Sequence, residues 1–167
     1  MAVETQPLGA VVTTHADFTD EEWAKLSGLP TVVIMAACIS DGHLMPGMRE
    51  MAAASEALAA GVKKFPDNAL LTEIVGTKPQ APKPDETKAS AGGAEGAMQM
   101  LVPEIEAGVA VAKAHLTVDE FAQLREVLLG AAEAAVERLG DGFMGSGEKV
   151  TTSEHAFIVQ LDGILSV

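Results

Sequence analysis

The sequence predicts an all-α protein, a bundle of six or seven helices in two pseudo-repeated halves joined by a Pro/Gly-rich linker. Three observations support this fold class. The 167-residue chain is 48% apolar but only 4% aromatic and contains no Tyr, so its core consists mainly of aliphatic side chains and Met, which favour closely packed helices. Apolar residues recur at helical spacing along much of the chain. A nine-residue pattern near the N-terminus also returns after the linker.

Capping signals and apolar spacing place the helices in order. The first helix is expected over residues 19–40, and Pro30 should kink it or split it after Leu29 because proline removes a backbone hydrogen bond. The clearest helix lies at 117–139, where apolar residues recur at steps of three and four. The remaining helices are predicted at 46–64, at 67–75 with Asp67 as N-cap, at 94–115 with a break near Pro103, and at 152–165.

The repeated pattern covers residues 18–26 and 116–124, an offset of 98 residues, and four of its nine positions are identical. In each copy a Thr is followed three residues later by a Glu, which is the signature of a capping box at a helix start. The two pairs are Thr19 with Glu22 and Thr117 with Glu120. An offset this long is too large for a solenoid repeat and fits a duplicated half-domain better.

These signals divide one domain into four segments. A stretch with three prolines, two glycines and almost no bulky apolar residue separates the halves and is expected to be flexible or extended. The predicted segments are an extended N-terminal segment at 1–16, a first helical half at 17–76, the linker at 77–95 and a second helical half at 96–167.

The charge balance restricts the classes of partner. With 11 basic and 24 acidic residues the net charge is −13, so the surface repels nucleic-acid phosphates and anionic membranes and suits cations or basic partners. No apolar run reaches about 18 residues, so membrane insertion is not expected. The N-terminus does not resemble a signal peptide, and Cys38 is a single cysteine in an apolar run, expected to be a buried thiol. We therefore expect a cytoplasmic protein.

One cluster of side chains could hold a metal ion. Asp41, His43, Met45, Met48 and Met51 lie within eleven residues, and imidazole and thioether ligands suit a soft ion such as Cu(I). Met also fills irregular spaces in helical cores, and the three methionines do not share one helix face. We favour core packing for these methionines and predict no cofactor, with a metal ion of unknown identity as the alternative.

Other chemical signals are incomplete. His155 and Asp162 are seven residues apart and could share a helix face as an acid–base pair, but no nucleophile accompanies them. Residues 142–149 are rich in glycine but lack the Gly-Lys-Ser/Thr ending of a phosphate-binding loop. The sequence therefore shows no assembled set of catalytic residues.

Two segments resemble a known family. Phe18–Trp23 is similar to the Phe-Thr-x-Glu-Glu-Trp start of an uncharacterised bacterial family of small helical proteins. Gly142–Leu165 is similar to the Gly-Phe-x-Gly-x-Gly loop, cap and final helix of the same family. The resemblance covers most of both halves but not the linker, and it implies an all-helical fold without implying an activity.

A second resemblance is to TerB-like helical domains from tellurite-resistance systems. It rests on Ser40-Asp41-Gly42 and on Asp141-Gly142 before residues 150–154. The resemblance implies a duplicated, acidic, all-helical protein linked to metal-ion stress. The extended acidic metal-site pattern of that family is not complete here, because His43 and Leu44 follow the first Asp-Gly pair.

Taken together, these features favour a non-enzymatic helical interaction or scaffolding protein that binds a protein partner or self-associates. Two alternatives stay open at this point. One is an acidic stress protein that binds a metal ion, and the other is a small-molecule carrier or enzyme with a pocket between the halves.

Overall fold

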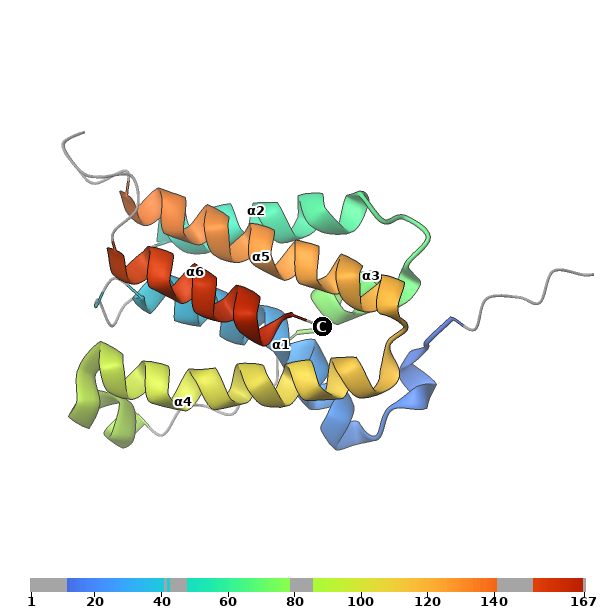
Figure 1. Ribbon diagram of the computed structural model, residues 1–167, viewed down its shortest axis with the longest axis horizontal. Helices are drawn as coiled ribbons and strands as arrows, with labels where there is room; N and C mark the ends of the chain where they lie inside the picture. Colours follow the sequence, from blue (N-terminus) through green and yellow to red (C-terminus); the bar gives the residue numbers. More distant parts are fainter. Residues whose placement is uncertain (1–11, 41, 43–47, 79–85, 141–151, 167) are drawn as a thin grey trace, which may run out of the picture.

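Helices make up the fold of the computed structural model, which describes residues 12–40, 42, 48–78, 86–140 and 152–166 (Figure 1). No strand occurs within these ranges, and the predicted all-α bundle of six or seven helices is confirmed. The elements are the 3-10 helix η1 (His15–Asp17) and the α-helices α1 (Asp20–Ile39), α2 (Met48–Lys63), α3 (Ala69–Gly76), α4 (Glu86–His115), α5 (Val118–Gly140) and α6 (Thr152–Ile164).

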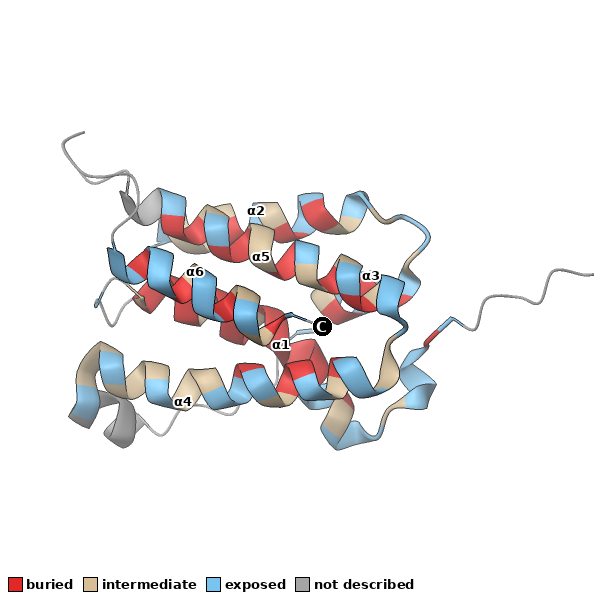
Figure 2. Ribbon diagram, viewed as in Figure 1, coloured by how far each residue is buried: buried red, intermediate tan, exposed pale blue. Residues whose placement is uncertain are grey.

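Helix α1 forms the centre of the bundle. It packs against α4 on one side and α5 on the other, while α2 and α6 pack against α5, and the buried faces of these helices point inward in Figure 2. Thirteen of the twenty residues of α1 are buried. The apolar stretch at 31–39 is therefore a central core segment, and Cys38 lies fully buried within it, as expected.

Within the described part of the chain, α1 is also the one helix that is long and apolar enough to cross a membrane by length and composition. The sequence expectation of no such segment considered only uninterrupted apolar runs, whereas α1 reaches a mean hydropathy of 1.3 with charges confined to its first turns. Two thirds of that apolar window is buried inside the bundle, at 67%, and a core helix passes the same test. The expectations of no membrane insertion and of a cytoplasmic location stay predictions.

The prolines do not break the helices that contain them. Helix α1 continues through Pro30 and α4 continues through Pro103, so α1 is not split after Leu29 and the predicted break near Pro103 is wrong. The alternative of a kink at Pro30 stays a prediction. Pro30 is buried within α1, where packing on several sides outweighs one lost backbone hydrogen bond. Pro103 and Gln99 lie on an exposed face of α4, where water can bind the Gln99 carbonyl group that lacks a helical donor.

Two boundaries also differ from the sequence prediction. Residues 86–92, expected in the linker, are helical, and a kink at Gly93, with φ 61° and ψ −151°, separates them from the rest of α4. The part of α4 after the kink begins at residue 94, as predicted. Ala and Glu in this stretch are strong helix formers despite its lack of bulk. The N-cap of α3 is Asn68 and not Asp67, because the Asn68 side chain accepts a hydrogen bond from the Leu71 amide at 2.9 Å.

Two glycines allow helices to approach closely. A Cβ atom at Gly108 of α4 would lie 3.0 Å from Leu29 Cδ1 and 3.1 Å from the Lys25 carbonyl oxygen of α1. A Cβ atom at Gly61 of α2 would lie 3.0 Å from a methyl group of Val127 in α5. These contacts set the spacing of the α1–α4 and α2–α5 pairs.

Candidate functional site: a groove between the halves

The two predicted capping boxes form with matching geometry. The Glu22 amide donates to Thr19 Oγ1 at 3.3 Å, and the Thr19 amide donates to a Glu22 carboxylate oxygen at 2.9 Å. The second box has the same two distances, 3.3 Å from the Glu120 amide to Thr117 Oγ1 and 2.9 Å from the Thr117 amide to Glu120. The repeated sequence pattern thus builds the same helix start twice, at the beginnings of α1 and α5.

Each capping glutamate also contacts the segment that precedes the other box. Glu120 accepts hydrogen bonds from the Thr13 amide at 3.1 Å and from the Thr13 hydroxyl at 2.7 Å. Glu22 Oε1 lies 3.1 Å from Nε2 of His115, at the end of α4. Through these contacts the starts of α1 and α5 are tied to each other at one end of the bundle.

Hydrogen bonds govern the ionisation of both glutamates. Hydrogen bonds from the Thr19 backbone and side chain, and then from His115, lower the pKa of Glu22 to about 2. Burial raises the pKa of Glu120, but hydrogen bonds from Thr117 and Thr13 outweigh that effect and lower it. Both side chains are therefore carboxylates at neutral pH and act as structural acceptors.

Residues 12–18, which we call the strap, cross this end of the bundle before α1 begins. The His15 ring stacks on Trp23, with ring centres 3.8 Å apart, and His15 Nδ1 lies 2.9 Å from a Glu73 carboxylate oxygen of α3. Phe18 contacts both Trp23 and His115, with ring centres 5.8 and 4.8 Å apart. Aromatic contacts and hydrogen bonds together position the strap and its first residue, Val12.

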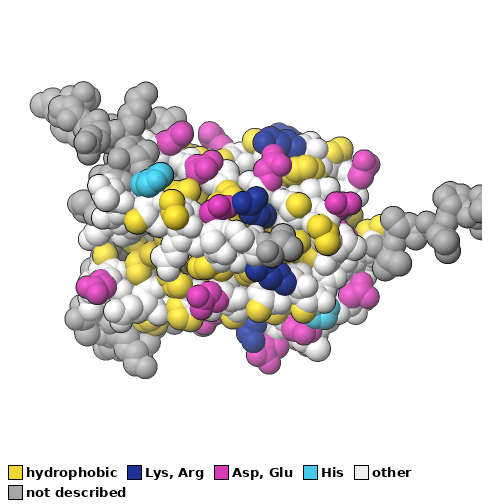
Figure 3. Space-filling model, in the orientation of Figure 1, with side chains coloured by type: hydrophobic (Ala, Val, Ile, Leu, Met, Phe, Trp, Pro, Cys, Tyr) yellow, Lys and Arg dark blue, Asp and Glu magenta, His cyan; other side chains and the backbone are white. Residues whose placement is uncertain are grey.

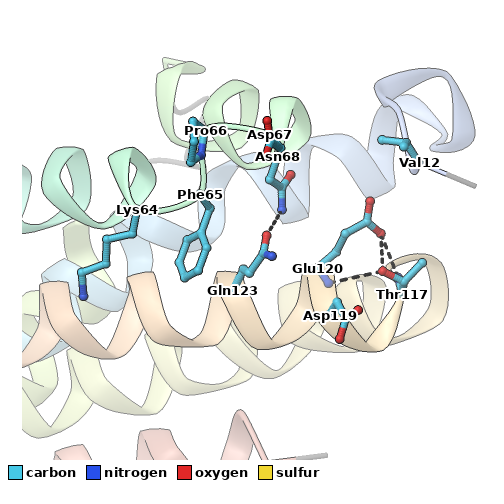
Figure 4. Close-up of a pocket in the computed structure, with 10 residues that line it drawn as sticks. All are labelled: Val12, Lys64, Phe65, Pro66, Asp67, Asn68, Thr117, Asp119, Glu120 and Gln123. Carbon is cyan, nitrogen blue, oxygen red and sulfur yellow. Dashed lines mark hydrogen bonds between the residues drawn. The ribbon is translucent and has the colours of Figure 1, made fainter. Parts of the chain in front are cut away.

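An open groove of about 500 Å³ lies between the turn that joins α2 to α3 and the first turns of α5 (Figure 4). Side chains from the first half, the second half and the strap line it, so the groove lies where the two halves meet. The lining residues are Val12, Lys64, Phe65, Pro66, Asp67, Asn68, Thr117, Asp119, Glu120 and Gln123.

The groove combines an apolar surface with an acidic rim. Phe65 and Pro66 supply apolar surface from one wall, and Asn68 Nδ2 donates to Gln123 Oε1 at 2.7 Å across the groove (Figure 4). Three carboxylates line it against one lysine, and Lys64 is paired with Glu126 of α5 at 2.9 Å. Asp67 and Asp119 are exposed to solvent, so a basic group entering the groove can reach them.

The predicted metal cluster is only partly within the described residues. Asp41, His43 and Met45 lie outside them. Met48, the first residue of α2, is 90% exposed, so the expectation that it packs in the core is wrong, because the helix start directs it to solvent. Met51 is partly buried against the core, as expected. The described part of the chain holds no group of three His, Cys, Asp or Glu side chains suited to a metal ion, and the metal site stays a prediction.

The other chemical candidates are not brought together. Asp162 pairs with Arg125 of α5, while His155 is exposed on α6. The glycine-rich segment 142–149 and the turn at Asp141 lie outside the described residues. Sequence reasoning identified Thr117 and Glu120 as caps but did not single out the groove, because its walls come from segments about fifty residues apart in the chain.

Comparison of the chain with protein-family models, with curated proteins and with solved structures gives no match. The resemblances to the bacterial helical family and to TerB-like domains therefore stay expectations.

Proposed function

We propose that this chain is a non-enzymatic helical interaction protein, and that its groove binds a partner segment carrying a basic side chain next to an apolar one. The observation that carries this proposal is the pairing of an apolar surface with exposed carboxylates in one open groove of about 500 Å³. Phe65 and Val12 offer apolar contact, and Asp67 and Asp119 offer charge to a Lys or Arg.

The shape of the groove favours a protein segment over a small molecule. Pockets for small ligands enclose most of the ligand surface, whereas this groove is open to solvent on one side. The net charge of −13 would also draw a basic partner at long range, and Figure 3 shows acidic side chains scattered over the face that it displays. An open, acidic groove therefore favours an interaction protein over a carrier or an enzyme.

A phage-displayed peptide library selected on the full chain tests the proposal. We expect enrichment of peptides with Lys or Arg beside an apolar residue, and weaker binding at high salt. Asp67→Asn and Asp119→Asn should each weaken a selected peptide by up to about fivefold, the range of an exposed ion pair. The control is Asp20→Asn, which removes an acid from the first turn of α1, outside the groove. Selection of no common motif, or of acidic peptides, would refute the proposal.

Self-association forms part of the same proposal. Val118 is 72% exposed beside the groove, and Val159 is 59% exposed on α6, so apolar side chains are available to a second copy. Sedimentation equilibrium of the full chain measures this directly. A monomer across the accessible concentration range would leave a separate protein as the partner and remove self-association from the proposal.

A further inference from the structure

A second hollow lies on another part of the molecule, between α1 and α2, with the end of α3 closing one side. Its volume is about 250 Å³, and we call it the α1–α2 hollow. Apolar side chains such as Ile34, Leu58 and Val75 form its walls. Among the described residues that line it none is charged, which distinguishes it from the acidic groove in a chain with net charge −13.

Hydroxyl groups supply the polar part of this lining. Ser27 donates its hydroxyl proton to the Trp23 carbonyl oxygen at 2.7 Å, and Ser55 donates to that of Met51 at 2.8 Å. Thr77 likewise donates to the Glu73 carbonyl oxygen at 2.7 Å. Because each of these three protons is already used within the protein, these hydroxyl oxygens offer a ligand acceptor capacity only. Thr31 lines the hollow as well, and its hydroxyl can both donate and accept.

The volume limits the size of a ligand. A cavity of about 150 Å³ holds benzene, which has six non-hydrogen atoms, so 250 Å³ corresponds to about ten. An ionised ligand would lose hydration without gaining an opposite charge in the hollow, which disfavours it strongly. An uncharged ligand with one donor group would instead match both the apolar walls and the hydroxyl acceptors.

We propose that the α1–α2 hollow binds a small uncharged aromatic or alicyclic compound that carries one N–H or O–H donor. This site is separate from the groove of the proposed function, and neither proposal depends on the other. Its walls come from two helices that both pack on α5, so a ligand there would bridge α1 and α2.

Indole serves as the probe, since it has one N–H donor and fits the volume, and 1-methylindole is the matched compound without the donor. Titration of the full chain is followed by amide chemical shifts. We expect saturable shifts in residues of α1 and α2, and binding of 1-methylindole about fivefold to tenfold weaker, the effect of one lost hydrogen bond. Equal affinity for the two compounds would overturn the donor requirement, and absence of saturable shifts would overturn the site.

Variants that fill the hollow with a larger side chain provide a second test of the proposal. Ala59 lines the hollow on α2, and Ala59→Leu should weaken indole binding at least tenfold by occupying the space. Thr31→Leu should do the same from the α1 wall, so the test does not depend on one variant. Ala60→Leu is the control, because Ala60 is exposed on the same helix but does not line the hollow. Indole binding that survives both filling variants in folded protein would contradict the proposal.

Discussion

Gly108 lies where α4 contacts α1 so closely that a methyl side chain does not fit without a shift of the neighbouring atoms. Ala is the better helix former by about 1 kcal/mol, yet a Cβ atom here would press on Leu29 and on the Lys25 carbonyl oxygen, which belongs to the backbone and cannot turn aside. We expect Gly108→Ala to lower the free energy of unfolding by about 1–3 kcal/mol through overpacking, measured by urea denaturation.

Gly130 is the matched control for that substitution. It lies within α5, and a Cβ atom there would meet nothing within 4 Å. Gly130→Ala should therefore raise the free energy of unfolding by up to about 1 kcal/mol, since only helix propensity changes. A stabilising Gly108→Ala variant would show that α4 can move away from α1 without loss.

The pKa of Glu22 gives a prediction about acid stability. Because the folded state lowers this pKa from 4.5 to about 2, the stabilisation is fully present above about pH 4.5 and is lost as the pH falls through 2. Glu22→Gln keeps an oxygen that can accept the Thr19 hydrogen bonds but removes the titrating charge. The free energy of unfolding, measured by urea denaturation, should therefore fall less steeply between about pH 5 and pH 2 for this variant than for the wild type. Parallel curves would show that Glu22 does not carry the acid sensitivity.

At the scale of the elements, the strap depends on one threonine. The Thr13 hydroxyl and amide both donate to Glu120, and the hydroxyl also lies 3.3 Å from the His115 carbonyl oxygen. Thr13→Val removes the hydroxyl with little change in shape and should lower the free energy of unfolding by about 1 kcal/mol. Amide hydrogen exchange should quicken in residues 12–18 but not in α6. Equal amide exchange rates in the strap of the wild type and of Thr13→Val would mean that the aromatic contacts position the strap without the Thr13 hydroxyl.

The sequence predicts the helices of this chain well where the signals are local, and less well where tertiary packing determines whether a helix continues. The capping boxes at Thr19 and Thr117 need only residues three apart, so the sequence predicted both. Whether a helix continues through Pro30 or Pro103 depends on burial and on access of water, and neither can be predicted from neighbouring residues in the sequence. The sequence also failed to predict the helical turns at 86–92, because Ala and Glu form helix without needing a large apolar face.

At the scale of the whole molecule, the repeat predicts two equivalent core positions. Trp23 and Phe121 each lie four residues after a capping Thr, and they are 9% and 3% exposed. Substituting either with Ala should lower the free energy of unfolding by about 3–5 kcal/mol, the usual effect of deleting a buried aromatic ring. Chemical denaturation of the two variants measures this. A large effect at one position alone would show that the halves contribute unequally to the core.

The fold class followed from the sequence because helical spacing and caps are periodic, short-range properties. The groove did not, since Phe65, Asn68 and Gln123 become neighbours only when α2, α3 and α5 pack together. The predicted metal cluster shows the reverse case, in which residues close in the sequence do not share an environment. Met48 and Met51 are close in sequence, yet one is exposed and the other packs on the core, so proximity along the chain did not predict a shared environment.

The central position of α1 has a consequence for synthesis on the ribosome. Its main neighbours, α4 and α5, are both translated later, and 98 residues separate Asp20 from Val118. At ordinary elongation rates of about 5–20 residues per second, the start of α5 follows that of α1 by roughly 5–20 s. The apolar surface of α1, the helix at the centre of the bundle, is thus synthesised several seconds before the helices that cover it.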